Sequence, residues 1–146
     1  MDSLPSLVLS RGTTSLRDPG AWISAYDAER ASDLPLPRLF LTGPHIDKFP
    51  PAHPHNAYVV ADELEARAAV DLFATQGASA IKIYFKASQG MIRAICEEAD
   101  ERGLPVTAHL EYSDIYQAIS NGLDGLEHIT SLGVNLVPPR RAEAYK

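Results

Sequence analysis

The chain has 146 residues, of which 45% are hydrophobic and 22% are charged, as in an ordinary soluble domain. Its formal net charge of −6 argues against nucleic-acid binding, because nucleic-acid binders present a basic face. No apolar run approaches the roughly 18 residues that span a membrane. The first ten residues lack the positive segment of a signal peptide, and the single cysteine, Cys96, excludes an internal disulfide. We therefore expect a cytoplasmic protein that binds neither nucleic acid nor membranes.

The predicted elements begin with a threonine-rich strand at residues 13–16. Asp18-Pro19 then supplies an N-cap and a first-turn proline, which predicts a helix running to about Glu29. A second apolar strand follows at residues 38–41. The proline-rich stretch after it predicts a long irregular loop to about residue 60.

The rest of the chain alternates three helices with three apolar strands. Asp62 opens a capping-box spacing, Ser88 caps the second helix and Ser113 caps the third, and each helix ends at a glycine. Their expected buried stripes are Leu64, Ala68, Leu72 and Phe73; Met91, Ile92, Ile95 and Ala99; and Ile115, Tyr116 and Ile119. The strands are expected at residues 80–85, 104–109 and 123–128.

This order of strand, capped helix, glycine and strand is the pattern of βαβ units, whose crossovers make the strands parallel. Either a barrel arc or an open doubly wound sheet fits, but no strand is followed by a glycine-rich dinucleotide fingerprint, which favours the barrel. A complete (β/α)8 barrel needs about 250 residues. We therefore expect one domain over residues 1–146, a partial TIM barrel of about five parallel βα units that does not close within this chain.

Three polar residues lie at or near the ends of successive predicted strands, where parallel βα folds collect their chemistry: Lys82, His109 and His128. Alternation along a strand places Tyr84 on the same face as Lys82 and Thr107 on the same face as His109, and points Glu127 away from His128. Each residue alone fits a structural role, since a histidine can be hydrogen-bonded in a core and a lysine can mark an edge strand. Three on consecutive strands indicate a shared site.

Imidazole is a good ligand for zinc and similar ions, whereas a protonated lysine is a poor one. A desolvated lysine can be neutral, and a neutral amine can react with carbon dioxide to give a carbamate that bridges two metals. The same amine could instead attack a carbonyl substrate as a Schiff-base nucleophile. The two histidines favour the metal interpretation.

Five segments carry a family resemblance: residues 12–18, 38–44, 80–84, 104–109 and 125–128. In this order they resemble the amidohydrolase superfamily, specifically its imidazolonepropionase-like and prolidase-like branch, over about residues 10–133. The resemblance implies a (β/α)8 barrel with one or two divalent metals, zinc by default. It implies that Lys82 is the carboxylated bridging lysine and that His109 and His128 bind metal. It also implies hydrolysis of a C–N bond in a small amide-type substrate by metal-activated water. Tyr84 and His45 are candidate substrate contacts.

The chain departs from the family at both flanks. It lacks the family's first-strand His-x-His pair before residue 12, and its last-strand aspartate after His128. His53-Pro54-His55 has the His-x-His spacing, but it lies in the proline-rich loop, so we take the match as coincidence. We therefore expect a fragment of a hydrolase that is inactive alone, with open barrel edges that invite a homo-oligomer or a complementing chain. The alternatives are a non-catalytic half-barrel binding or assembly module, and a Schiff-base lyase that uses Lys82.

Overall fold

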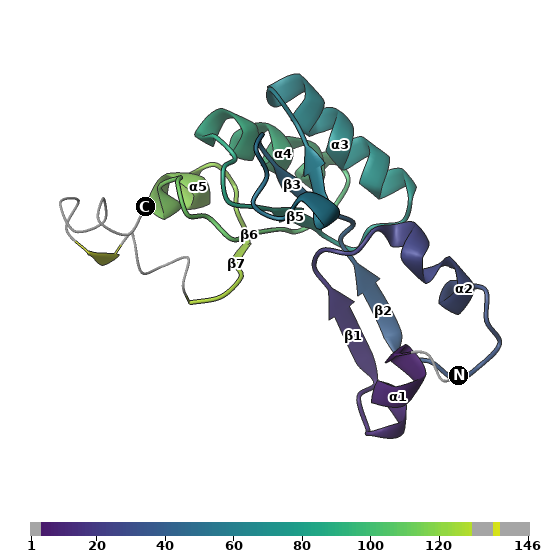
Figure 1. Ribbon diagram of the computed structural model, residues 1–146. Helices are drawn as coiled ribbons and strands as arrows, with labels where there is room; N and C mark the ends of the chain where they lie inside the picture. Colours follow the sequence, from purple (N-terminus) through teal and green to yellow (C-terminus); the bar gives the residue numbers. More distant parts are fainter. Residues whose placement is uncertain (1–3, 130–135, 138–146) are drawn as a thin grey trace.

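The computed structural model describes residues 4–129 and 136–137, which form a mixed α/β fold (Figure 1). The elements are α1 (Leu4–Ser10), β1 (Ser15–Asp18), η1 (Ile23–Tyr26), α2 (Asp27–Arg30), β2 (Arg38–Leu41), β3 (His45–Asp47), η2 (Pro54–Asn56), β4 (Ala57–Val59), α3 (Glu63–Thr75), β5 (Ile81–Ile83), α4 (Gln89–Glu101), β6 (Val106–Ala108), α5 (Ile115–Ser120) and β7 (Gly125–Leu126). No helix of the described part is long and apolar enough to cross a membrane.

Every strand pairing of the described residues is parallel, as the βαβ pattern predicts. Five strands form one sheet in the order β4-β3-β5-β6-β7, while β1 and β2 pair separately. Figure 1 shows α3, α4 and α5 on one side of the larger sheet, with β1 and β2 extending away from it. Within residues 4–129 and 136–137 both sheets are open, and neither closes into a ring.

The stretch predicted as an irregular loop contains two of the five strands, so that prediction was wrong. The chain bends between β2 and β3 at Gly43, whose φ of 77° suits glycine, and a side chain there would meet the Phe73 ring 3.2 Å from its Cβ. After the bend, β3 joins the large sheet, where Tyr84 donates its backbone N–H to the carbonyl of Ile46 at 2.9 Å. The prolines around β3 and β4 predict a loop, whereas these strands form because neighbouring strands supply their hydrogen-bond partners.

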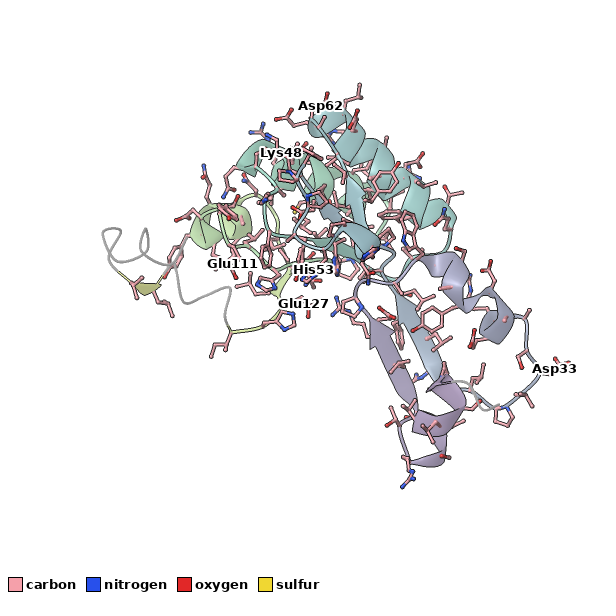
Figure 2. The ribbon with its side chains drawn as sticks, in the orientation of Figure 1. Asp33, Lys48, His53, Asp62, Glu111 and Glu127 are labelled. Atoms are coloured by element: carbon pink, nitrogen blue, oxygen red, sulfur yellow. The ribbon has the colours of Figure 1, made fainter. Side chains whose placement is uncertain are left out.

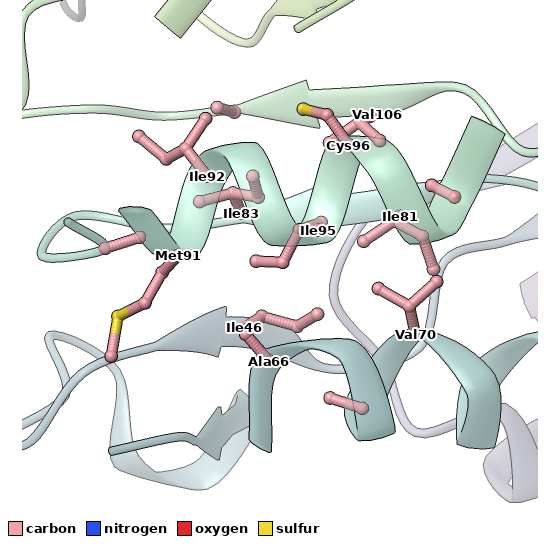
Figure 3. Packing of buried hydrophobic residues seen from close by; sticks show 14 of the residues in the cluster. Ile46, Ala66, Val70, Ile81, Ile83, Met91, Ile92, Ile95, Cys96 and Val106 are labelled. Atoms are coloured by element: carbon pink, nitrogen blue, oxygen red, sulfur yellow. The ribbon is translucent and has the colours of Figure 1, made fainter. Parts of the chain in front are cut away.

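The helices pack a continuous apolar core against one face of the sheet, as seen in Figure 3. The predicted stripe of α4 is confirmed, since Met91, Ile92, Ile95 and Ala99 are all buried. The predicted stripe of α3 is wrong except for Phe73. The buried face of α3 consists of Ala66, Ala69, Val70 and Phe73, while Leu64 is 76% exposed. Small alanines let α3 approach α4 closely, so the larger leucines are left on the outside.

Two predicted helix starts also need correction. Asp18 does not cap a helix; its Oδ1 accepts the backbone N–H groups of Gly20 and Ala21 at 3.0 Å each, and helical structure begins later, at η1. The third predicted cap is one residue off, because Asp114 accepts the N–H of Gln117 whereas Ser113 donates to the carbonyl of Ala87. The caps at Asp62 and Ser88 are confirmed.

Candidate functional site

The face of the sheet opposite the helices carries the candidate site. Ile81, Ile83, Val106 and Ala108 all point into the helix-covered core. Since side chains alternate, Lys82 and Thr107, which are paired in register between β5 and β6, point to the other face. Tyr84 and His109 follow with the same parity, just past the carboxyl ends of these strands. Parallel α/β folds place their chemistry at this end.

Lys82 is the most unusual residue of this face, because its side chain is only 1% exposed. Its Nζ finds no hydrogen-bond partner among the described residues. Burial lowers the pKa of Lys82 to about 8; the Glu127 carboxylate acts in the opposite direction, and Arg17 adds to the lowering. The amine therefore loses its proton more easily than that of an ordinary lysine.

A polar bridge connects β1 to the larger sheet beside Lys82. Arg17, on β1, forms an ion pair with Glu127 and also donates to the hydroxyl of Thr107 at 2.8 Å. Burial alone would raise the pKa of Glu127, but the hydrogen bonds from Arg17 and Thr107 outweigh it and hold the pKa low. Sequence patterns did not predict this bridge, because Arg17 and Glu127 are 110 residues apart.

His109 is buried and held on one side by a carboxylate. Its Nε2 lies 2.8 Å from Oε1 of Glu111, while the buried Nδ1 has no hydrogen-bond partner within the described ranges. Its ring centroid lies 5.0 Å from that of His128 and 5.1 Å from that of Tyr84. A carboxylate that fixes one ring nitrogen sets the orientation of the other, as around metal-binding histidines.

His128 reaches this cluster through an irregular backbone. Gly125 pairs with Thr107, so Glu127 points to the site face, and strict alternation would turn His128 toward the helices. The chain leaves the strand, however, and His128 has φ of 66°, a left-handed conformation that is rare for a residue with a side chain. This turn brings its ring beside His109. We predicted that Glu127 and His128 point to opposite faces of the strand. Because of this turn, His128 nevertheless lines the same pocket as Lys82.

His45 and Tyr84 form the other part of the site. Their rings stack with centroids 4.3 Å apart and an interplanar angle of 11°. Burial, assisted by the neighbouring Lys82 and His53, lowers the pKa of His45 to about 4, so the ring is neutral at neutral pH. Gly20 approaches so closely that an added Cβ would lie 2.4 Å from Nε2 of His45. His45 begins β3 instead of lying in the predicted loop.

These side chains surround a pocket of about 410 Å³, lined by Pro19, His45, His53, Pro54, His55, Asn56, Lys82, Tyr84 and His128. With His109 beside His128, all five histidines of the chain gather at this end of the sheet. Figure 2 shows His53, Glu111 and Glu127 at the same end. His53 and His55 both line this pocket. We took the His-x-His spacing of His53-Pro54-His55 as a coincidence, and that interpretation does not predict their place here.

A larger hollow of about 630 Å³ lies at the opposite end of the strands and contains neither histidine nor lysine. It is bordered by residues before β6 and β7, such as Pro105 and Asp124. This is the end of the strands where parallel α/β folds do not place their chemistry.

The ordinary metal-binding side chains do not form a complete cage. Within residues 4–129 and 136–137, no group of three or more His, Cys, Asp or Glu residues is arranged to hold a metal ion. The trio expected from the sequence has a different composition, with two imidazoles and one lysine amine. Its members fit a metal in part, because the Nζ of Lys82 and the Nδ1 of His109 are buried polar atoms without partners in the described structure.

No protein-family model and no curated protein matches the chain. Several solved structures are similar to the chain. An amidohydrolase is 27% identical with a TM-score of 0.67, over 83% of this chain and 38% of that protein. A proposed prolidase from Bifidobacterium longum is 27% identical with a TM-score of 0.71, over 85% and 34%. A Xaa-Pro dipeptidase with methionine bound in its active site is 26% identical with a TM-score of 0.65, over 80% and 37%.

The chain thus has the parallel α/β architecture of these enzymes and spans about a third of the length of each. The similarity extends over 80–85% of this chain. The chain is similar in fold and in sequence to structures of the amidohydrolase superfamily, as the ordered motifs of its sequence predict.

Proposed function

We propose that this chain supplies part of the active site of a hydrolase that cleaves a C–N bond in a small amide-type substrate. The observation that carries the proposal is the convergence of Lys82, His109 and His128 at the carboxyl end of parallel strands, beside a pocket. The names of the similar structures support it, since they include an amidohydrolase, a prolidase and a dipeptidase.

In this proposal Lys82, His109 and His128 are the residues that hold a divalent metal, zinc by default. When bound, such an ion supplies a Lewis acid and an activated water. Lys82 contributes best as a carbamate, which forms when its neutral amine bonds to the carbon of carbon dioxide and releases a proton. Glu111 orients the ring of His109, while Tyr84 and His45 border the space for substrate.

We further propose that the chain is an arc of a (β/α)8 barrel, folded as a single domain over residues 1–146. The parallel sheet with helices on one face is the arrangement of a barrel wall, and the site face is then the barrel interior. Three ligands alone would bind a metal weakly. We therefore expect this chain on its own to have no measurable hydrolase activity, whereas the arc plus the remainder of a barrel would have it.

Metal uptake tests the proposal without requiring activity. The chain is dialysed to equilibrium against buffer that contains saturating zinc and 13C-labelled bicarbonate, and bound zinc is measured by elemental analysis as the excess over the outside buffer. We expect bound zinc and a carbamate carbon signal in NMR spectra, both lost in Lys82→Ala, and zinc lost in His109→Ala. Lys48→Ala, an exposed lysine near the site, is the matched control and should retain both. A chain that takes up neither zinc nor carbon dioxide under saturating conditions would refute the metal site.

The buried, unpaired amine of Lys82 also favours a second candidate, a lyase that forms a Schiff base with a carbonyl substrate. Borohydride reduction in the presence of pyruvate, followed by peptide mass analysis, separates the two. A stable adduct at Lys82 together with no zinc uptake would support the lyase, and the absence of any adduct would exclude it.

A further inference from the structure

We propose that His53, carried by the loop of residues 48–56, is a substrate-contacting residue that helps to determine specificity at this pocket. This inference rests on the proposed function, because it takes the ligand to be a small amide-type molecule. The loop holds the one motif that the sequence analysis set aside, His53-Pro54-His55, and its position in the structure gives that motif a role.

The loop is fixed to the sheet by a buried carboxylate. Asp47 is 0% exposed, and its Oδ1 accepts the backbone N–H groups of Lys48 and Lys86 at 2.9 Å each. Its Oδ2 accepts the N–H of Ala52 at 3.0 Å. One side chain therefore ties the start of the loop, its middle and the segment after β5 together. A buried carboxylate satisfied by three backbone donors is a rigid attachment.

Two further hydrogen bonds hold the rest of the loop. The Nζ of Lys86 donates to the carbonyl of Pro50 at 2.7 Å, and the indole N–H of Trp22 donates to the carbonyl of His55 at 3.3 Å. The loop is thus attached at both ends and in the middle, which preorganises it as a wall of the pocket. Preorganised walls bind ligands without the entropic cost of ordering a loop.

The ring contacts of His53 place it beside Tyr84 and His45, which are not among the proposed metal ligands. The His53 centroid lies 5.5 Å from that of Tyr84 and 6.5 Å from that of His45, whereas His109 and His128 contact each other. Among the described residues, His53 has ring contacts with His45, Tyr84 and Phe85 but none with His109 or His128, although Lys82 and His128 line the same pocket. We therefore assign His53 to ligand contact rather than to metal binding.

The lining defines the chemistry that His53 would recognise. The nine lining residues contribute imidazoles, an amine, an amide and a phenol, but no carboxylate. Such a surface favours a ligand that presents hydrogen-bond-accepting oxygens, as carbonyl and carboxylate groups do. His53 is itself exposed at the rim, so its substitution should leave the fold intact.

The test uses the full chain and N-acetylglycine as the probe, a compound with one amide bond and accepting oxygens. Titration is followed by NMR at the ring signals of His53 and by calorimetry. We expect the His53 signals to shift on titration. His53→Ala should raise the Kd for N-acetylglycine by about 3- to 10-fold, the range of one lost hydrogen bond. Zinc affinity should change by less than about twofold, as for a residue outside the metal site.

Lys48→Ala, on the same loop but outside the pocket, is the matched control and should leave both constants unchanged. Asp47→Asn should weaken N-acetylglycine binding through displacement of the loop, without removing any pocket-lining group. No shift of the His53 signals, or an unchanged Kd in His53→Ala, would overturn the inference, and so would loss of zinc from His53→Ala. N-acetylglycine bound through His53 by a chain that takes up no zinc would refute the metal proposal and leave this inference standing.

Discussion

The amine of Lys82 is buried on β5, and it lacks a hydrogen-bond partner among the described residues. Burying an amine in this way costs folding free energy, since the charged form loses its hydration. A protein tolerates such a residue when its chemistry is needed. The stability of the chain should therefore improve when Lys82 is replaced by an apolar side chain of similar length.

We predict that Lys82→Met raises the free energy of unfolding at pH 7 by roughly 1–3 kcal/mol, while abolishing zinc uptake. The pKa of Lys82 in the folded chain, about 8, lies below its ordinary value of 10.5. Between these values the unfolded chain binds a proton that the folded chain does not, so the wild type gains stability as pH rises from about 8 to 10.5. Urea unfolding at pH 7, 8 and 10 measures both effects. Lys48→Met is the control, and an equal pH slope in wild type and Lys82→Met would contradict the prediction.

At the scale of single residues, what the sequence predicts depends on how regular the backbone is. Lys82 and His109 could be identified because they lie on or directly after short strands, where alternation and strand ends are readable. His128 reaches the site through a left-handed turn with φ of 66°, which no strand pattern encodes. Arg17 and His53 were missed because long-range contacts place them, across 110 residues for Arg17 and through the Asp47 attachment for His53.

At the scale of elements, the buried face of α3 differs from the apolar stripe that its sequence pattern predicts. Its apolar residues lie on two faces, and the sequence alone does not decide which face is buried. Phe73, at 0% exposure, packs beneath the bend between β2 and β3, with its ring centroid 5.3 Å from that of Tyr58. Leu64 belongs to the exposed face. The face of α3 that carries Phe73 is buried because it packs against the bend at Gly43.

We predict that Phe73→Ala lowers the free energy of unfolding by about 3–5 kcal/mol, because it removes a fully buried ring and leaves a cavity. Leu64→Ala, on the same helix, should change it by less than about 0.5 kcal/mol, since the side chain is 76% exposed. Chemical denaturation followed by circular dichroism measures both variants. Similar losses in the two would mean that α3 is buried on the face first predicted from its sequence.

The helices that begin with an N-cap side chain and end before a glycine are the elements that the sequence predicts best. Asp62 and Ser88 accept backbone N–H groups at the starts of α3 and α4, and Gly77 and Gly103 follow the ends of these helices with positive φ. The strands β3 and β4 lack such signals. They exist because neighbouring strands supply hydrogen-bond partners, and these neighbours lie far away in the sequence.

At the scale of the whole molecule, the two sheets of the described chain are linked at the site by side chains. The ion pair of Arg17 with Glu127 joins β1 to the segment after β7, an edge strand of the larger sheet. Among the described residues, β7 pairs only with β6, and α5 leaves Tyr116 and Ile119 exposed at 64% and 53%. In a longer barrel wall, a following helix would cover this surface of α5.

We therefore predict that the chain self-associates through the surface formed by β7 and α5. Light scattering after gel filtration should give a mass above the 15.9 kDa of one chain. The double variant Tyr116→Lys/Ile119→Lys places two charges on the exposed face of α5 and should shift the chain toward the monomer, with an unchanged circular dichroism spectrum. Leu64→Lys, on the exposed face of α3, is the matched control and should leave the mass unchanged. A wild-type monomer at concentrations of about 0.1 mM would contradict the prediction.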